Sequence, residues 1–472
     1  IRSTSSNNIQ SVNLPHSKIE DETAYTTPES DYFSAYPLGL TLYSTSSDSF
    51  LIIPTQQTTY ALNLEEANNQ VFDFQSESVQ QPYLGNALVL GGAPSQFQIE
   101  LSAWQWDGNQ WNTQWNNTID ANDAFLSSND SQTLYADFTD QRINLSDGTE
   151  QSPLPNPQQR SATVNGIFTV LTVNQVKLEP AGSTYPINKN GNRHYSGAVQ
   201  LGEERQGFYY LSDDELLIFD PESFNQPKTI VQNIHLGWPA MADLNNDGRI
   251  DFSYVNQETG AVEARNNNGA LLANFPITPP QNTRFIGTPL VTRSEQSGDI
   301  TLYIPTQDSL SLNINAYTID GEPIEGSTLY VGNISDQNNQ PIHPVIHKNT
   351  LYAASHRGDV KAWQLDNIAD VLWASRYGNS SMNKISGSIN TENPQEPSPA
   401  NAILVKEETY NWPNPAKDFT NIRFQTSGSG TVEVKIITSG GRIVFDKNYE
   451  AKGGAPEEYQ ISTQNWSSGL YF

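Results

Sequence analysis

The fold is decided by one stretch of the sequence, Trp238-Pro239-Ala240-Met241-Ala242-Asp243-Leu244-Asn245-Asn246-Asp247-Gly248-Arg249-Ile250-Asp251. It opens on a proline before small apolar residues, continues through a polar loop, and runs into alternating residues from Ile250 to Tyr254. Alternation of apolar and polar residues is typical of a β-strand, and a loop rich in Asn, Asp and Gly is typical of a turn. The stretch therefore predicts a β-hairpin.

The same order of features recurs along the chain. A proline before small apolar residues returns at Pro289 and at Pro344, and a polar turn and a strand follow each one. A second strand then carries a small residue before a large one, and the three pairs are Ala264-Arg265, Ala316-Tyr317 and Ala362-Trp363. Fainter copies upstream bring the total to seven or eight.

This repeat predicts the fold class. A period of roughly 40–50 residues with about four short strands is typical of β-propeller blades. One four-stranded sheet cannot bury both of its faces, whereas sheets packed face to face in a ring bury both and protect their edges. We predict an all-β protein with a seven- or eight-bladed β-propeller over residues 31–378. A string of β-sandwiches is the alternative.

Composition narrows the range of partners. The chain has 472 residues, with 25 Lys and Arg against 52 Asp and Glu, and its net charge is -27. Nucleic-acid binding depends on basic residues that neutralise phosphates, so we expect no nucleic-acid partner. There is no cysteine, which excludes disulfides and thiolate chemistry. The chain begins at Ile1, and we expect it to be part of a longer precursor.

The polar loop has the spacing of a calcium site. Oxygen side chains occupy positions 1, 3, 5 and 9, with Gly248 at position 6, where a calcium loop turns sharply. Position 12 is Tyr254, where an EF-hand has a glutamate, and no helical pattern flanks the loop. We therefore expect a calcium loop inside a β-hairpin. A hairpin turn without metal is the alternative.

Two resemblances follow from these residues. The Asp-x-Asn-x-Asp-Gly-x-x-Asp turn, preceded by Pro-x-Met-Ala-Asp, resembles the calcium-bearing propeller repeats of the FG-GAP or VCBS type. The copy from Leu351 to Trp363 resembles a blade of quinoprotein-like propellers, but it does not imply a pyrroloquinoline quinone cofactor. The first resemblance implies that one blade holds calcium, and that its ligands are Asp243, Asn245, Asp247, Asp251 and the carbonyl of Arg249.

Other parts of the chain lack the repeat. Residues 1–30 are polar, and we expect an N-terminal tail that carries one strand at its end. Residues 379–408 contain three prolines among Ser, Asn and Glu, which indicates a semi-extended linker.

The last 64 residues, 409–472, have alternating strands that predict a small β-sandwich. Three motifs occur in order: Pro413-Asn414-Pro415, Gly440-Gly441 after an apolar strand, and Gly469-Leu470-Tyr471. In this order they resemble the C-terminal sorting domain of the type IX (Por) secretion system of Bacteroidetes. Members of that family continue beyond the last motif, so we expect the domain to be truncated at Phe472.

The resemblance implies a function. The chain would be exported cargo of a Gram-negative bacterium, secreted or held at the outer-membrane surface after passing the periplasm. Its sorting domain would be recognised by the outer-membrane translocon and a shuttle β-barrel. The propeller would be a binding or scaffold module with a glycan or protein ligand. The alternatives are a propeller enzyme acting on glycans, and an accessory tail of an upstream catalytic domain such as a protease.

We find no convincing catalytic set and expect no enzyme activity within this chain. A zinc site from His343, His347 and His356 is the less favoured interpretation, because strand spacing distributes such residues over both faces. The acidic run Asp213-Asp214-Glu215 predicts a hairpin turn. Four tryptophans between Trp104 and Trp115 could stack on carbohydrate, but packing between blades is the favoured role.

Overall fold

The structure, a computed structural model, is built from β-strands, with one short 3-10 turn (Pro221–Ser223) in the described ranges. Among these ranges, no helix has the length and apolar character needed to cross a membrane. The structure describes residues 11–12, 23–26, 40–45, 48–54, 59–65, 71–74, 83–84, 87–95, 98–120, 126–127, 133–136, 141–153, 159–160, 167–172, 174–187, 194–202, 205–295, 297–324, 326–334, 342–355, 359–365, 367–376, 378, 409–426, 430–438, 443–451, 456–464, 466, 469 and 471.

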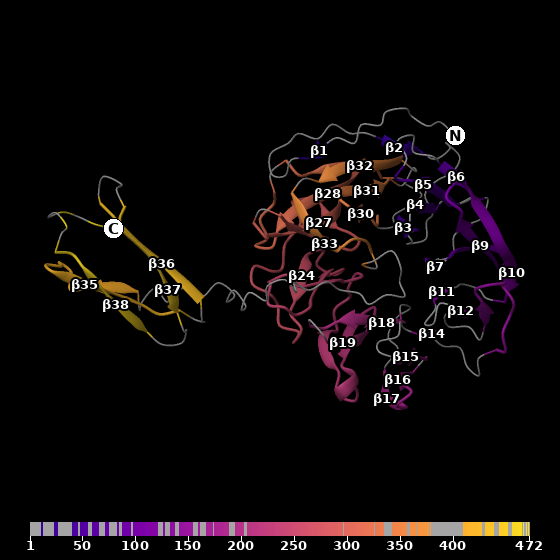
Figure 1. Cartoon of the computed structure of the whole chain (residues 1–472), viewed down its shortest axis with the longest axis horizontal. Coiled ribbons are helices and arrows are strands. Elements are labelled where there is room, and N and C mark those ends of the chain that lie inside the picture. Colours follow the sequence, from indigo (N-terminus) through magenta and orange to yellow (C-terminus); the bar gives the residue numbers. More distant parts are fainter. Residues whose placement is uncertain are drawn as a thin grey trace. The chain divides into compact units, whose positions relative to one another are not determined.

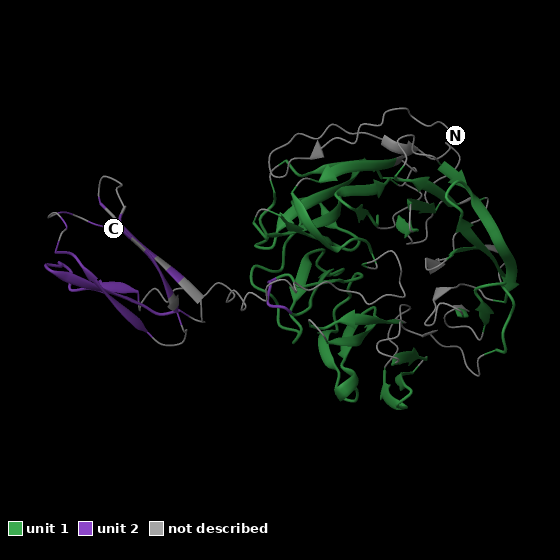
Figure 2. Ribbon diagram, in the orientation of Figure 1, with its two compact units in different colours: residues 1–244, 249–389 green, residues 245–248, 390–472 purple. Residues whose placement is uncertain are grey.

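The chain forms two compact units, shown in Figure 2. The first unit contains residues 1–244 and 249–389, and the second contains residues 245–248 and 390–472. The expected linker, 379–408, lies outside the described residues.

The first half of the first unit contains four antiparallel sheets in chain order (Figure 1). Their strands are β3 (Thr41–Ser44), β4 (Ser49–Pro54), β5 (Thr59–Asn63) and β6 (Val71–Asp73); β7 (Tyr83–Leu84), β8 (Leu88–Ser95), β9 (Gln98–Trp106) and β10 (Trp111–Ile119); β11 (Leu126–Ser127), β12 (Thr133–Ala136) and β13 (Arg142–Asn144); and β14 (Gln159–Arg160), β15 (Phe168–Leu171), β16 (Gln175–Glu179) and β17 (Ser183–Pro186).

The second half contains four more sheets in the same order. Their strands are β18 (His194–Gln200), β19 (Gln206–Ser212), β20 (Glu215–Phe219) and β21 (Lys228–Gln232); β22 (Ala240–Ala242), β23 (Asp251–Val255) and β24 (Val262–Arg265); β25 (Arg284–Phe285), β26 (Leu290–Ser294), β27 (Ile300–Gln307), β28 (Ser311–Thr318) and β29 (Leu329–Asn333); and β30 (Val345–His347), β31 (Thr350–Ala354) and β32 (Asp359–Leu365).

Clusters of apolar side chains link most of these sheets to a neighbour in the series. Tyr60 and Leu62 on β5 pack on one side, while Ala61 between them packs on the other. The side chains of Tyr60 and Leu62 meet Tyr352 and Val360 of the last sheet, so the first and last sheets share one apolar cluster. A sheet that packs on neighbours through both faces depends on those neighbours for its stability. The prediction of an all-β propeller is confirmed, and the blade number stays a prediction.

The N-terminal region covers an edge of the last sheet. Strand β2 (Thr23–Thr26) pairs antiparallel with β32, and β1 (Ser11–Val12) pairs parallel with it further along. The expected tail of residues 1–30 therefore contains two short strands rather than one. The polar sequence did not predict both strands, because a strand that adds to a sheet edge through backbone hydrogen bonds needs little alternation of apolar residues.

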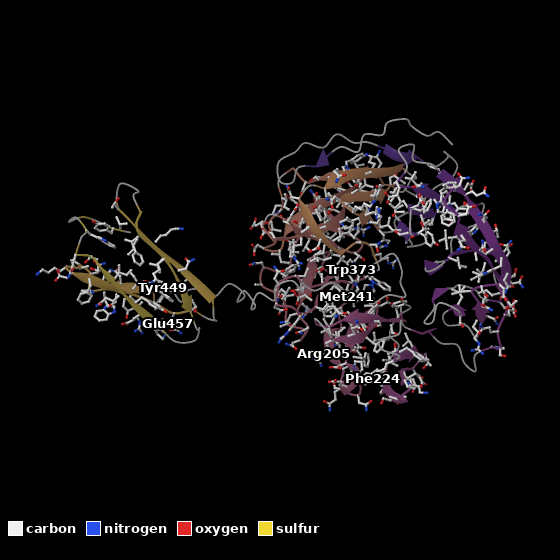
Figure 3. The ribbon with its side chains drawn as sticks, viewed as in Figure 1. Arg205, Phe224, Met241, Trp373, Tyr449 and Glu457 are labelled. Carbon is white, nitrogen blue, oxygen red and sulfur yellow. The ribbon has the colours of Figure 1, made fainter. Side chains whose placement is uncertain are left out.

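Strand β33 (Ile368–Trp373) follows the last sheet in sequence but pairs antiparallel with β26 of the preceding sheet. Trp373 belongs to the same apolar cluster as Met241 of β22, and Figure 3 labels both. The next residue, Ala374, accepts a hydrogen bond from the Ile346 N–H of β30 at 2.7 Å. The segment 368–374 therefore contacts strands of three successive sheets.

The second unit is a small β-sandwich, as predicted. One sheet contains β34 (Tyr410–Trp412), β35 (Phe419–Phe424) and β38 (Glu457–Ser462), and the other contains β36 (Gly430–Ile437) and β37 (Ile443–Ala451). Phe424 and Tyr459 from the first sheet pack against Tyr449 of the second. Strand β34 pairs only with β35 and is an edge strand of its sheet.

Candidate functional site

The predicted calcium loop connects β22 and β23, and the hairpin prediction is confirmed. Asp243 and Asp251, at the two ends of the loop, are both 0% exposed. The Leu244 N–H donates to Asp251 Oδ2 at 3.0 Å. Within the loop, the Asp247 N–H donates to Asn245 Oδ1 at 3.0 Å. Gly248 has a φ of 74°, which favours glycine at this sharp turn.

The donor chemistry of this loop suits calcium. Ca²⁺ prefers carboxylate and amide oxygens, and two of the carboxylates are fully buried, where a charge needs a partner. Arg249 is exposed. Within the described ranges, however, no three His, Cys, Asp or Glu side chains are grouped closely enough to hold a metal ion. Calcium at this loop stays a prediction.

Tyr254, at position 12 of the loop, has a different role from the EF-hand glutamate. Its hydroxyl donates to Glu263 Oε2 at 2.8 Å and accepts from Arg265 Nε at 2.8 Å. Asn256 and Arg265 also donate to Glu263. Burial alone would raise the pKa of Glu263, but these hydrogen bonds outweigh burial and lower it. This network braces β23 against β24.

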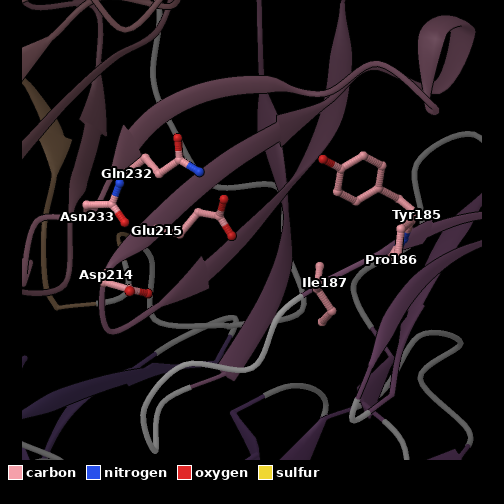
Figure 4. Close-up of a pocket in the computed structure, with 7 residues that line it drawn as sticks. All are labelled: Tyr185, Pro186, Ile187, Asp214, Glu215, Gln232 and Asn233. Atoms are coloured by element: carbon pink, nitrogen blue, oxygen red, sulfur yellow. The ribbon is translucent and has the colours of Figure 1, made fainter.

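A small polar pocket lies between two neighbouring sheets, near the acidic turn between β19 and β20. It encloses about 180 Å³. Figure 4 shows the Glu215 carboxylate and the Tyr185 hydroxyl pointing into the space between β17 and β20. The residues that line it are Tyr185, Pro186, Ile187, Asp214, Glu215, Gln232 and Asn233. The acidic run predicted the turn but not the pocket, because Tyr185 and Gln232 come from other strands than the turn.

The pocket is rich in hydrogen-bond acceptors. Burial, and then the Asp214 carboxylate, raises the pKa of Glu215. Ser212 Oγ donates to Asp214 Oδ1 at 3.1 Å, which holds the second carboxylate in place. Among the described residues, no lysine or arginine lines the pocket. Two carboxylates and two side-chain amides can therefore accept or exchange hydrogen bonds with a small ligand that carries donors.

The histidines do not form a metal site in the described part of the chain. His343 is buried, whereas His347 Nε2 lies 3.7 Å from Glu65 Oε1. His356 lies outside the described residues. Zinc coordination by these residues is therefore not supported.

The tryptophans pack between sheets, as the favoured interpretation predicted. Trp106 and Trp111 pack against Phe50 of the first sheet, with ring centroids 4.9 Å from it. Trp115 Nε1 donates to the Leu145 carbonyl at 2.8 Å, towards the following sheet. These rings do not form an exposed platform for carbohydrate stacking.

The predicted sorting-signal residues lie mostly at the surface of the second unit. Pro413, Asn414 and Pro415 are exposed after β34, and the Pro413 carbonyl accepts from Thr420 Oγ1 at 3.4 Å. Tyr471 forms an antiparallel bridge with Thr438. Gly469 is exposed beside Tyr471. Gly440 and Gly441 lie outside the described residues.

The second unit corresponds to a known family. Residues 411–472 match the family described as secretion system C-terminal sorting domain (Por_Secre_tail). Over this stretch, the chain is similar to the sorting domains of that family. The match confirms the resemblance seen in the three motifs, and it indicates a secreted cargo that reaches the cell surface or the medium.

Comparison with solved structures gives fold-level likeness. The computationally designed Ika8 protein has 12% identity and a TM-score of 0.44, covering 71% of this chain and 98% of that one. An inactive virginiamycin B lyase from Staphylococcus aureus has 12% identity and a TM-score of 0.36. The match covers 73% of this chain and 98% of the lyase. PorZ, a surface component of the type-IX secretion system of Porphyromonas gingivalis, has 10% identity and a TM-score of 0.36. The match covers 91% of this chain and 62% of PorZ. No curated protein sequence matches the chain.

Proposed function

We propose that the outer-membrane translocon and shuttle β-barrel of the type IX system recognise residues 409–472, and that the propeller is the binding module delivered to the cell surface. The match over residues 411–472 is the observation that carries this proposal. The FG-GAP or VCBS character of the propeller is part of the same proposal.

Exposed aromatic residues on the second unit support recognition by another protein. Tyr410, Trp412 and Phe419 are 48%, 45% and 40% exposed. Register places all three on one face of the sheet, because Tyr410 pairs with Arg423 and Trp412 with Asn421. The opposite face is buried against β36 and β37. Exposed aromatic side chains on one face are typical of interaction sites.

The experiment is export of the full chain from a type IX-competent cell. We expect the wild-type chain at the cell surface or in the medium, and a chain lacking residues 409–472 in the periplasm. Trp412→Ser and Tyr471→Ala should reduce export. The matched control is Leu310→Ala, which removes an exposed apolar side chain from the propeller. Unchanged export of the deleted chain would contradict the proposal.

The polar pocket supports glycan binding as the propeller's activity. Carboxylate and amide side chains beside a tyrosine can hydrogen-bond the hydroxyl groups of a sugar. A volume of about 180 Å³ is below the roughly 300–1,000 Å³ of sites for drug-sized ligands, which suits a small ligand such as one sugar residue.

Calorimetry with neutral monosaccharides tests the pocket. Glu215→Gln and Asn233→Ala should each weaken binding by about tenfold, equivalent to ~1.4 kcal/mol. The control Glu322→Gln removes an exposed carboxylate elsewhere and should leave affinity unchanged. Equal affinities of Glu215→Gln and the wild type for the monosaccharide would exclude this pocket as the sugar-binding site.

Calcium at the loop is the third part of the proposal. Its ligands would be Asp243, Asn245, Asp247, Asp251 and the Arg249 carbonyl, and the ion would neutralise the buried carboxylates. A bound ion at 100 times its Kd stabilises a fold by about 2.7 kcal/mol. A chelator should therefore lower the melting temperature of the wild type but not of Asp247→Ala. The control Asp320→Ala, in an exposed turn, should respond as the wild type does.

A further inference from the structure

The residues before the first long strand of three successive sheets occupy equivalent positions. Trp238, Thr288 and His343 each precede the proline that leads into β22, β26 and β30. All three side chains are buried, at 5%, 1% and 6% exposure. The repeat therefore places one polar or aromatic group at the start of β22, of β26 and of β30. The related position before Pro37 lies outside the described residues.

The segment that follows β33 adds a cation to these groups. Val291 of β26 pairs with Trp373, and Ala374 accepts from the Ile346 N–H of β30. Since β33 runs antiparallel to β26, the chain leaves it at the end where β26 begins. The Arg376 guanidinium then lies over the Trp238 ring, 5.4 Å from its centroid, and acts electrostatically on His343. We call Trp238, Thr288, His343 and Arg376 the axial cluster.

Close backbone packing holds His343 beside Gly287, the residue before Thr288. Gly287 has a φ of 74°, and an added Cβ there would lie 2.6 Å from the Ile342 carbonyl and 3.6 Å from His343 Nδ1. The His343 carbonyl accepts from the Leu40 N–H at 3.3 Å. His343 is therefore held between the loop before β26 and the start of the first sheet.

Two members of the cluster have unmet hydrogen-bonding capacity. Thr288 Oγ1 and both ring nitrogens of His343 have no hydrogen-bond partner among the described residues. Buried polar groups are nearly always hydrogen-bonded, to protein, water or ligand. A guanidinium, a hydroxyl and an imidazole N–H together offer donors and a positive charge, which suit the oxygens of an anion.

We propose that the axial cluster binds the anionic oxygens of a small ligand, either a carboxylate or a phosphate group. Arg376 supplies the charge, Thr288 and His343 donate hydrogen bonds, and Trp238 holds the guanidinium in place. This site is separate from the polar pocket near Glu215, whose described lining residues include no cation and which we assign to a neutral sugar.

Binding would also change the protonation of His343. Burial, and then the charge of Arg376, lowers the pKa of His343 well below its ordinary value, so the imidazole is neutral at pH 7. Arg376 is the charged group that acts on it. An anion bound between the two would offset that positive charge and raise the pKa of His343. Affinity should therefore increase as pH falls.

Calorimetric titration of the full chain with inorganic phosphate and with acetate, at constant ionic strength, tests the proposal. We expect one of the two to bind, which identifies the group. Arg376→Gln should weaken that binding by at least about tenfold, and Thr288→Val by roughly threefold. The control Arg284→Gln removes an equal charge from an exposed strand position and should bind as the wild type does.

A second measurement separates binding from a structural role. The His343 imidazole, followed by NMR and assigned with His343→Gln, should show a raised pKa when the anion is added. If Arg376→Gln does not fold, Arg376→Lys is the second variant. It keeps the positive charge but lacks the two parallel N–H donors of the guanidinium, so it should bind the anion more weakly than the wild type. The proposal would be overturned if neither anion binds, or if the Arg376 variants bind as tightly as the wild type. Bound water would then be the partner of Thr288 and His343.

Discussion

The two units use aromatic residues in opposite ways. In the propeller, Phe252 is fully buried in a cluster shared by three successive sheets, and Trp363 packs between the last two. In the sorting domain, each sheet has one buried face around Phe424, while Trp412 and Phe419 are exposed. A closed series of sheets leaves no face free, whereas a two-sheet sandwich keeps an outer face for a partner. The aromatic residues of the propeller therefore stabilise its fold, whereas the exposed ones of the sorting domain are available to a partner.

The largest expected effect comes from removing a buried ring in each unit. Phe252→Ala and Phe424→Ala should each destabilise by about 3–5 kcal/mol, with Phe252→Ala near the upper end. The reason is that sheets packed on both sides cannot collapse into the cavity, whereas the small sandwich can. Urea unfolding of the full chain, with fluorescence and NMR probes for each unit, measures both. A larger loss for Phe424→Ala would contradict the comparison.

The next effect tests the polar network of β23 and β24. Glu263→Gln leaves Arg265 and Tyr254 without their charged acceptor, so it should destabilise by about 1–3 kcal/mol. The control Glu322→Gln should change stability by less than about 0.5 kcal/mol, because its side chain is exposed. Equal stability of both variants would mean that the network contributes nothing measurable.

The same glutamate predicts a pH dependence. The folded pKa of Glu263 is below its ordinary value of 4.5, so its contribution is complete above about pH 4.5. The contribution is lost as pH falls through the folded pKa, since the unfolded state then binds the proton more readily. The difference in unfolding free energy between wild type and Glu263→Gln should therefore shrink between pH 5 and acid pH. If this difference grows on acidification, the pKa of Glu263 is not lowered in the folded state.

The smallest effect concerns the ion pair that joins the first and last sheets. Lys348 Nζ lies 2.7 Å from Glu65 Oε1, and the lysine side chain is 65% exposed. Hydrogen bonding and the charge of Lys348 lower the pKa of Glu65. Glu65→Gln should destabilise by less than about 1 kcal/mol, because exposed ion pairs are weak. A loss in thermal unfolding as large as that of Phe252→Ala would mean that closure depends on charge rather than on apolar packing.

Sequence predicted the elements whose side chains alternate. Strands β23, β27 and β31 lie where the repeat placed them, because burial on two faces requires apolar residues at fixed positions. Strands β1 and β2 pair through backbone groups at an edge, and β33 pairs with β26 instead of β32. Backbone pairing leaves little pattern in a sequence, so such partners come only from the three-dimensional arrangement.

The candidate sites divide in the same way. The loop spacing and the sorting motifs lie within short stretches, so their residues could be named directly. The pocket combines Tyr185 with Glu215 and Gln232, and the axial cluster combines Thr288 with Arg376, which no local motif connects. The proline repeat gave a usable signal for the second, since it placed Trp238, Thr288 and His343 in equivalent positions.

The pairing of β2 with β32 has a consequence for how the protein is made. Residues 23–26 meet residues 359–361, so the two ends of the propeller sequence form one seam. This seam cannot form until both ends of the propeller sequence are available in the same chain. A propeller cut short before residue 359 would therefore leave β2 without its partner strand.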